Sequence, residues 1–165
     1  MGWLEEEVGI IEFKGTFDLK GMIMMMHSYL KHQNYDFYEK LHKAKVPELE
    51  LEWFCERKTT RYHKYILELE FHFYDLKEVE VKDENGNTKK MMDGRFFIKI
   101  DGDVVQDFTG SWGDTKNNSF KKKMKDLYEL VTRRDFMMKH AAVLIGEATA
   151  LRDKTNSFLG MVASY

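Results

Sequence analysis

A chain of 165 residues with 43% hydrophobic and 33% charged residues can bury a core of its own and is too apolar to be disordered. Its net charge of −2 creates no overall field that would select nucleic acid or an anionic membrane. The one cysteine, Cys55, excludes an internal disulfide and a four-thiolate metal site. Glu5 to Glu7 stand where a secretory signal would be cationic. We therefore expect a single domain over residues 1–165, in the reducing cytoplasm.

A strand and a helix are expected at the start of the chain. Residues 8–17 alternate between apolar and polar side chains, and Asp18 then occupies an N-cap position. Residues 19–30 carry apolar side chains at helical spacing, which predicts a helix of about three turns. Strands are expected next over 35–43 and 49–56, with Pro47, the only proline, between them.

The clearest pattern covers residues 62–74, where Tyr65, Leu67, Leu69, Phe71 and Phe73 alternate with mainly polar residues. This alternation is typical of a long antiparallel strand with one face on a core and the other in water. The alternation breaks at 75–77, so we predict a bend or bulge there and a separate fifth strand around Val79 and Val81. Asn85-Gly86 favours a tight turn, and a sixth strand is expected over 96–108.

A helical pattern begins at Ser119, after a loop around Trp112, and continues almost to Gly160, the expected stop. The pattern is compatible with one long helix or with two helices broken near 133–135. The apolar stripe, counted at alternating steps of four and three from Phe120, contains Phe120, Met124, Leu127, Val131, Met138, Ala141, Ile145, Ala148 and Leu159.

The predicted fold class is α+β. We expect a curved antiparallel sheet of five to six strands, an N-terminal helix after the first strand, and a long C-terminal helical segment packed on one face of the sheet. Residues 1–116 would form the sheet with its inserted helix, and residues 117–162 the helical segment. This order of elements resembles the helix-grip arrangement of Bet v 1 and START-related proteins, which implies an apolar cavity between the sheet and the last helix.

Several short segments form a familiar set. They are Phe17-Asp18-Leu19, residues 34–40, residues 74–81, Asp107-Phe108 with Trp112, and Leu127-Tyr128-Glu129. Together they resemble an uncharacterised group of small archaeal proteins over most of the chain. The resemblance implies an archaeal, cytosolic, single-domain protein, and it carries over no activity, because none is established for that group.

The residues that could carry catalysis form no recognisable site. His27 and His32 are five residues apart, which is not the spacing of a helical metal pair. Cys55 falls on the apolar face of its strand, as a buried structural thiol does. We therefore expect no catalytic residue, no metal and no cofactor. An acidic binding face is a further possibility, formed by the water-facing side chains Glu48, Glu50, Glu52, Glu56, Glu68 and Glu70.

The length of the helical tail favours a binding or assembly role. A continuous tail would span about 60 Å, whereas a strand of about ten residues spans about 33 Å. The surplus apolar helix has to be buried by folding back, by a second copy or by another protein. The hypothesis is therefore a non-catalytic, self-assembling or protein-binding chain that acts through this segment and a sheet face.

Two alternatives remain open, and neither involves a membrane. A carrier of a small apolar molecule would hold its ligand in a helix-grip cavity. Its lining would be Leu67, Leu69, Phe71, Phe96, Ile98 and Ile100 facing Leu127, Val131 and Met138. An RNA- or ribosome-associated factor would use the basic helix face, made of Lys121, Lys122, Lys123, Lys125, Arg133 and Arg134.

Overall fold

The computed structural model describes the backbone of residues 6–82, 84–106 and 117–160, and the side chains of these residues except 6–8 and 133–138. The predicted loop around Trp112 and the junction at Asp107 and Phe108 lie outside these ranges. The elements in chain order are β1 (Glu6–Phe17), α1 (Leu19–His32), β2 (Asp36–Lys45), β3 (Glu48–Lys58), β4 (His63–Lys82), β5 (Thr88–Gln106), α2 (Ser119–Phe136), the π-helical turn η1 (Met137–Ala141) and α3 (Ala142–Phe158).

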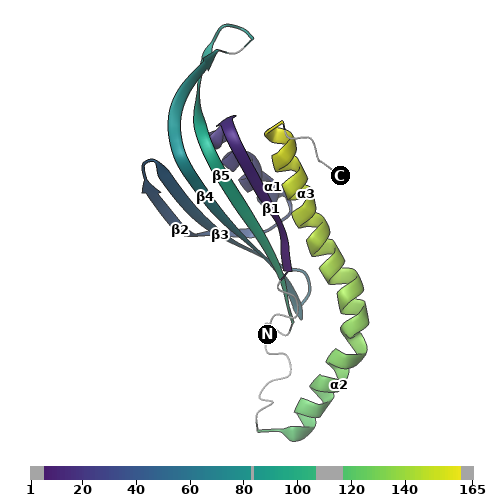
Figure 1. Cartoon of the computed structure of the whole chain (residues 1–165). Coiled ribbons are helices and arrows are strands. Elements are labelled where there is room, and N and C mark those ends of the chain that lie inside the picture. The colour runs from purple at the N-terminus through teal and green to yellow at the C-terminus, as the bar shows by residue number, and fades with distance from the viewer. Residues whose placement is uncertain (1–5, 83, 107–116, 161–165) are drawn as a thin grey trace.

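The five strands form one antiparallel sheet in the order β1-β5-β4-β3-β2 (Figure 1). Strands β2 to β5 are a meander of neighbours in the chain, and β1 pairs with the outer edge of β5. The inward side chains of β3, β4 and β5 form one buried core with residues of α1 and α3. The sheet is curved, and both helices cover the same face (Figure 1). The predicted α+β class is confirmed.

The predicted fourth and fifth strands are a single strand, β4, so the sheet has five strands. The break in alternation is a bulge: the pairing with β5 shifts between Tyr74 and Lys77, and Asp75 has a φ of 55°. An extra residue in one strand reverses the alternation without ending the strand. Gly94 of β5 faces this bulge, and a Cβ atom there would lie 2.8 Å from the Tyr74 carbonyl oxygen.

Helix α1 begins at the predicted cap. A carboxylate oxygen of Asp18 accepts a hydrogen bond of 3.0 Å from the Gly21 amide. The hydrogen bond from Lys89, and then the one from Gly21, lower the pKa of Asp18. Met22, Met26 and Leu30 on the inward side of α1 are completely buried. The methionine-rich segment therefore covers the sheet.

The C-terminal segment is helical without interruption from Ser119 to Phe158, through α2, η1 and α3, and Gly160 follows with a φ of 72°. A π-helical turn contains more residues than an α-helical turn, so it changes which later residues share a face. The residues of α3 that pack on the sheet are Leu144, Ala148 and Leu151. The predicted stripe residue Ile145 is instead 38% exposed.

Because Leu151 faces the sheet and Ile145 faces water, truncation of these two side chains should lower the free energy of unfolding by different amounts. Leu151→Ala should lower the free energy of unfolding by about 2–5 kcal/mol, because Leu151 is completely buried. Ile145→Ala should cost less than about 1 kcal/mol, as surface substitutions do. Urea unfolding of both variants measures the difference, and equal losses would contradict the placement of α3.

Candidate interaction surface

An ion pair between Arg57 of β3 and Glu147 of α3 ties the last helix to the sheet. Arg57 donates to a carboxylate oxygen of Glu147 at 2.7 Å and to the carbonyl of Gln33, at the end of α1, also at 2.7 Å. The two side chains are 18% and 15% exposed. The guanidinium also lies against the rings of Tyr35 and Tyr65, at 4.8 and 5.1 Å from their centroids. One arginine thus holds α1, α3 and the sheet together.

The hydroxyl groups around this ion pair are structural donors. Tyr35 donates to the second carboxylate oxygen of Glu147 at 2.6 Å, and Tyr29 donates to its backbone carbonyl at 3.0 Å. Burial, and then the hydrogen bond to Glu147, raise the pKa of Tyr35, so it remains a neutral donor. Burial also raises the pKa of the Cys55 thiol to about 12, which leaves negligible thiolate at neutral pH.

A pair of histidines joins η1 to the start of β4. The rings of His63 and His140 are stacked with centroids 4.3 Å apart, and the Tyr65 hydroxyl lies 2.8 Å from Nδ1 of His140. Burial lowers the pKa of both histidines; His140 lowers that of His63 further, and Lys139 that of His140. At neutral pH the pair is therefore uncharged and packs as two aromatic rings.

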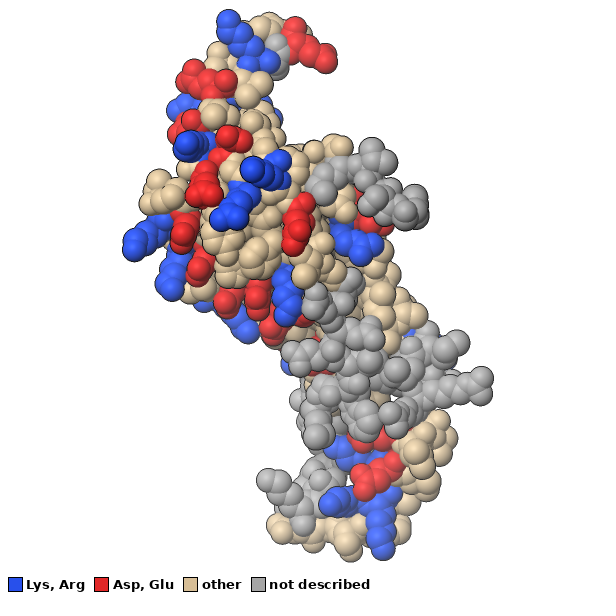
Figure 2. All heavy atoms as spheres, viewed as in Figure 1, with Lys and Arg blue, Asp and Glu red and all other residues tan. Residues whose placement is uncertain are grey.

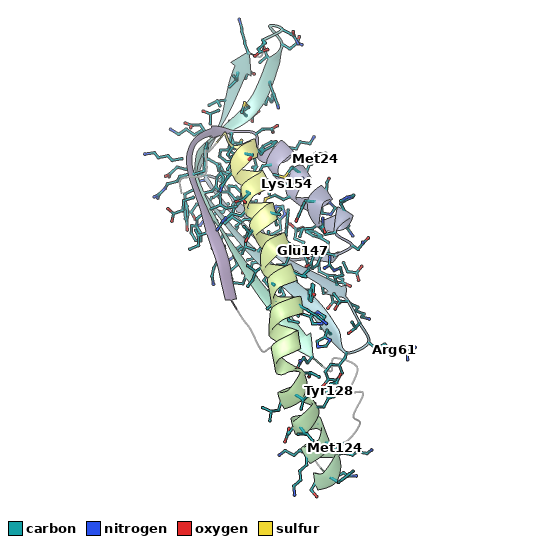
Figure 3. All side chains as sticks on the ribbon, turned by 90° about the vertical axis from the view of Figure 1, so that its right-hand side faces the viewer. Met24, Arg61, Met124, Tyr128, Glu147 and Lys154 are labelled. Atoms are coloured by element: carbon teal, nitrogen blue, oxygen red, sulfur yellow. The ribbon has the colours of Figure 1, made fainter. Side chains whose placement is uncertain are left out.

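Helix α2 extends past the end of the sheet and exposes apolar side chains. Figure 3 shows Glu147 on the part of the helical segment beside the sheet, and Tyr128 and Met124 on the part beyond it. Phe120 is 70% exposed and Val131 is 71% exposed. We call the exposed apolar residues of this helix the α2 face: Phe120, Met124, Leu127, Tyr128, Leu130 and Val131.

The β3–β4 turn fixes the position of α2. The Tyr62 hydroxyl donates to Glu129 at 3.0 Å, and the rings of Tyr62 and Tyr128 meet edge to face with centroids 5.7 Å apart. These contacts involve one side of the helix and leave Leu130 and Val131 exposed. The α2 face is therefore held in place by the rest of the molecule.

The two halves of the predicted cavity lining lie apart. All six sheet residues, Leu67, Leu69, Phe71, Phe96, Ile98 and Ile100, are buried in the core. Leu127 and Val131 are exposed on α2, because that helix lies beyond the sheet, and the side chain of Met138 lies outside the described residues. The predicted partners from the helix are replaced by residues of α1 and α3.

The residues of the predicted basic face lie on the same helix as the α2 face. Lys121, Lys122 and Lys123 are exposed in the first turns of α2, and Lys125 is half-buried. The side chains of Arg133 and Arg134 lie outside the described residues. The exposed apolar surface of α2 is thus bordered by charged side chains, of which the lysines outnumber Asp126 and Glu129.

The outward face of the sheet is acidic, as the alternation of the strands predicts. Glu52 is directly opposite Glu70 across β3 and β4, and Glu68 is directly opposite Asp101 across β4 and β5. Three ion pairs offset part of this charge: Lys40–Glu68, Lys64–Glu56 and Lys99–Asp101. Figure 2 shows acidic and basic side chains intermixed over the sheet. We call this surface the outer sheet face.

Two pairs of residues that shape these surfaces were not predicted from the sequence. Asp101 and Asp103 extend the acidic face onto β5, and their alternation with Ile100 and Val104 was a usable signal. Arg57 and Glu147 had no usable signal, because 90 residues separate them.

The described residues offer few features for small ligands. A cleft of about 300 Å³ lies between α1 and the edge of the sheet, lined by Ile23, Met24, His27, Ser28, Phe37, Glu39 and Trp53. Within the described ranges, no group of three His, Cys, Asp or Glu residues is placed to hold a metal ion. In the same ranges, every helix is too short or too polar to cross a bilayer.

The chain matches no protein-family model, and no curated protein or solved structure is significantly similar to it. The resemblances to small archaeal proteins and to helix-grip proteins therefore stay predictions. The function has to be argued from the surfaces described above.

The ion pair predicts an asymmetry between two substitutions of glutamate. Glu147→Ala should lower the free energy of unfolding by about 3 kcal/mol, because it leaves the largely buried Arg57 without its carboxylate. Glu68→Ala breaks the exposed pair with Lys40 and should cost less than about 1 kcal/mol. Thermal and urea unfolding measure both losses in the free energy of unfolding. Similar losses for the two variants would mean that Arg57 does not hold α3 against the sheet.

The histidine pair predicts a loss of stability in mild acid. The folded-state pKa of His63 and of His140 lies below the unfolded value of 6.5, so the unfolded chain binds more protons as the pH falls through 6.5. The stabilisation present above that pH is then lost as the pH falls from 6.5 through the lower folded-state pKa values. A His63→Gln/His140→Gln variant should lose less stability over this interval than the wild type. Urea unfolding at a series of pH values tests this, and parallel curves would refute it.

Proposed function

We propose that this is a non-catalytic binding or self-assembling protein that acts through its C-terminal helical segment and a sheet face. The observation that carries the proposal is the α2 face, six large apolar side chains exposed on a helix that projects beyond its own sheet. An exposed apolar surface bordered by charged residues is typical of a protein–protein interaction site. Its position is fixed by Tyr62, as that of a preformed binding surface would be.

The strength of the expected complex follows from the size of this surface. Full burial of one large apolar side chain contributes about 1.5–3 kcal/mol, and association costs about 4–15 kcal/mol of translational and rotational freedom. Burial of four to six side chains is of the same order as this cost. We therefore propose a reversible complex, with charged contacts at its edge.

A protein partner is better supported than the two alternatives. A polynucleotide would engage Lys121 to Lys123 through phosphates but would leave Leu130 and Val131 exposed to water. A small apolar ligand in the predicted cavity would not contact the α2 face, because Leu127 and Val131 are exposed on a helix that lies beyond the sheet. The proposal therefore places a homo-oligomer or a complex with another protein in the cytoplasm.

Sedimentation velocity over a range of concentrations tests self-assembly. We expect the wild type to associate and a Leu130→Ser/Val131→Ser variant to associate at least tenfold more weakly. Val46→Ser is the matched control, because Val46 is 90% exposed in the β2–β3 turn, far from α2 in the chain. The control should behave as the wild type does.

Carbene footprinting tests for a different protein as the partner. The purified wild type and the protein in an extract of its native cells are labelled in parallel, and modification of Phe120, Leu130 and Val131 is read by mass spectrometry. Protection in the extract, or in the concentrated purified protein, supports the proposal. Full labelling of these residues in both preparations, with a monomer at every concentration, would refute it.

A further inference from the structure

We propose that the α2 face binds the outer sheet face of a second copy of this chain, in a head-to-tail arrangement. This inference rests on the proposed function and names the partner of the same surface. Its basis is the complementary charge of the two surfaces: α2 begins with exposed lysines, and the outer sheet face carries directly opposed carboxylates.

Pairing of α2 with α2 of a second copy is electrostatically poor in either direction. In a parallel pair, Lys121 to Lys123 of one helix would lie beside the same residues of the other. In an antiparallel pair they would lie near residues 133 to 135, which are Arg-Arg-Asp in the sequence, and two copies of α2, each with six basic and three acidic residues, would bring together surfaces of the same net sign. Like charges brought together at an interface disfavour that interface. The apolar side chains of α2 therefore need a partner surface of the opposite sign.

The outer sheet face has that sign. Seven carboxylates project outward from the middle of three strands, Glu50, Glu52 and Glu56 on β3, Glu68 and Glu70 on β4, and Asp101 and Asp103 on β5. Lysines pair with Glu56, Glu68 and Asp101, and His72 lies 3.9 Å from Glu50. Like charges directly opposite each other across a sheet are destabilising. Glu68 and Asp101 are already paired with Lys40 and Lys99, so it is the Glu52–Glu70 pair that favours a cationic partner.

The same face has a hollow beside these carboxylates. It measures about 150 Å³ and is lined by Ile66, Gly102 and the three carboxylate residues Glu68, Asp101 and Asp103. A lysine places its methylene groups on apolar surface and its ammonium group at a polar rim. Ile66 provides the apolar wall. The rim contains Glu68 and Asp101, which are paired with Lys40 and Lys99 of the same copy, and Asp103, so a lysine of a second copy would join or exchange with these ion pairs.

The dimensions and positions of the two surfaces allow the contact. Helix α2 has 18 residues and is about 27 Å long, whereas the 11 residues of β3 extend about 36 Å. Both helices that cover the sheet lie on its other face, and α2 projects beyond the sheet (Figure 1). Because the two surfaces are different, each bound copy offers a new site to the next one. The assembly is therefore an open chain of copies or a ring.

Mixing two variants tests this arrangement directly. The α2 variant is Leu130→Glu/Val131→Glu, and the sheet variant is Glu52→Lys/Glu70→Lys. Each variant keeps one intact surface, so each should be a monomer alone. An equimolar mixture should form a one-to-one dimer that does not grow, as measured by sedimentation velocity and native mass spectrometry. A Glu80→Lys/Glu84→Lys control alters exposed acidic residues beyond the outer sheet face and should assemble as the wild type does.

Other outcomes overturn the inference. If the sheet variant self-associates as the wild type does, α2 pairs with something other than the acidic face. If the wild type is a monomer and its α2 face is protected only in extract, the partner is a different protein and the proposed function stands alone. If α2 is labelled in every preparation, both proposals fail. Thermal unfolding checks that the variants are folded, and Val131→Ser replaces an α2 variant that is not.

Discussion

The apolar inner face of one five-stranded sheet has to be covered from a single side, and the rest of the structure depends on this constraint. Helix α1 covers part of the face with Met22, Met26 and Leu30, and α3 covers part with Leu144 and Leu151. The helix that contains α3 is longer than the sheet it covers, so part of it extends past the end of the sheet (Figure 1). The exposed part is α2, and its apolar residues are surplus to the needs of the core.

Polar contacts decide where along the sheet the long helix lies. The Arg57–Glu147 ion pair fixes α3 against β3 and the end of α1, and the stacked histidines fix η1 against β4. These contacts involve buried or half-buried groups, so sliding of the helix by one turn would leave polar groups without partners inside the protein. The ion pair and the stacked histidines therefore hold α2 outside the core. In our account this makes the α2 face a permanent feature of the folded monomer.

Local rules of sequence predicted the elements well. Strict alternation located β3 and β4, the Asp18 cap located α1, and Gly160 located the end of α3. The sequence did not predict the single long β4, because a bulge and a strand end produce the same break in alternation. It also did not predict η1. After this turn the predicted Ala141 and Ala148 are buried together with Leu144 and Leu151, whereas the predicted Ile145 is exposed. The site depends on contacts between distant residues, which no local pattern contains.

A fluorescent reporter at position 130 tests most directly whether another molecule covers the α2 face. Leu130→Cys can be labelled with an environment-sensitive thiol dye, because the only native thiol, Cys55, is buried and has a pKa raised to about 12. Our account predicts that the emission moves to shorter wavelength as the concentration of unlabelled protein rises, or in native extract. A Val46→Cys control should not respond. An unchanged spectrum at position 130 under all these conditions would contradict the account.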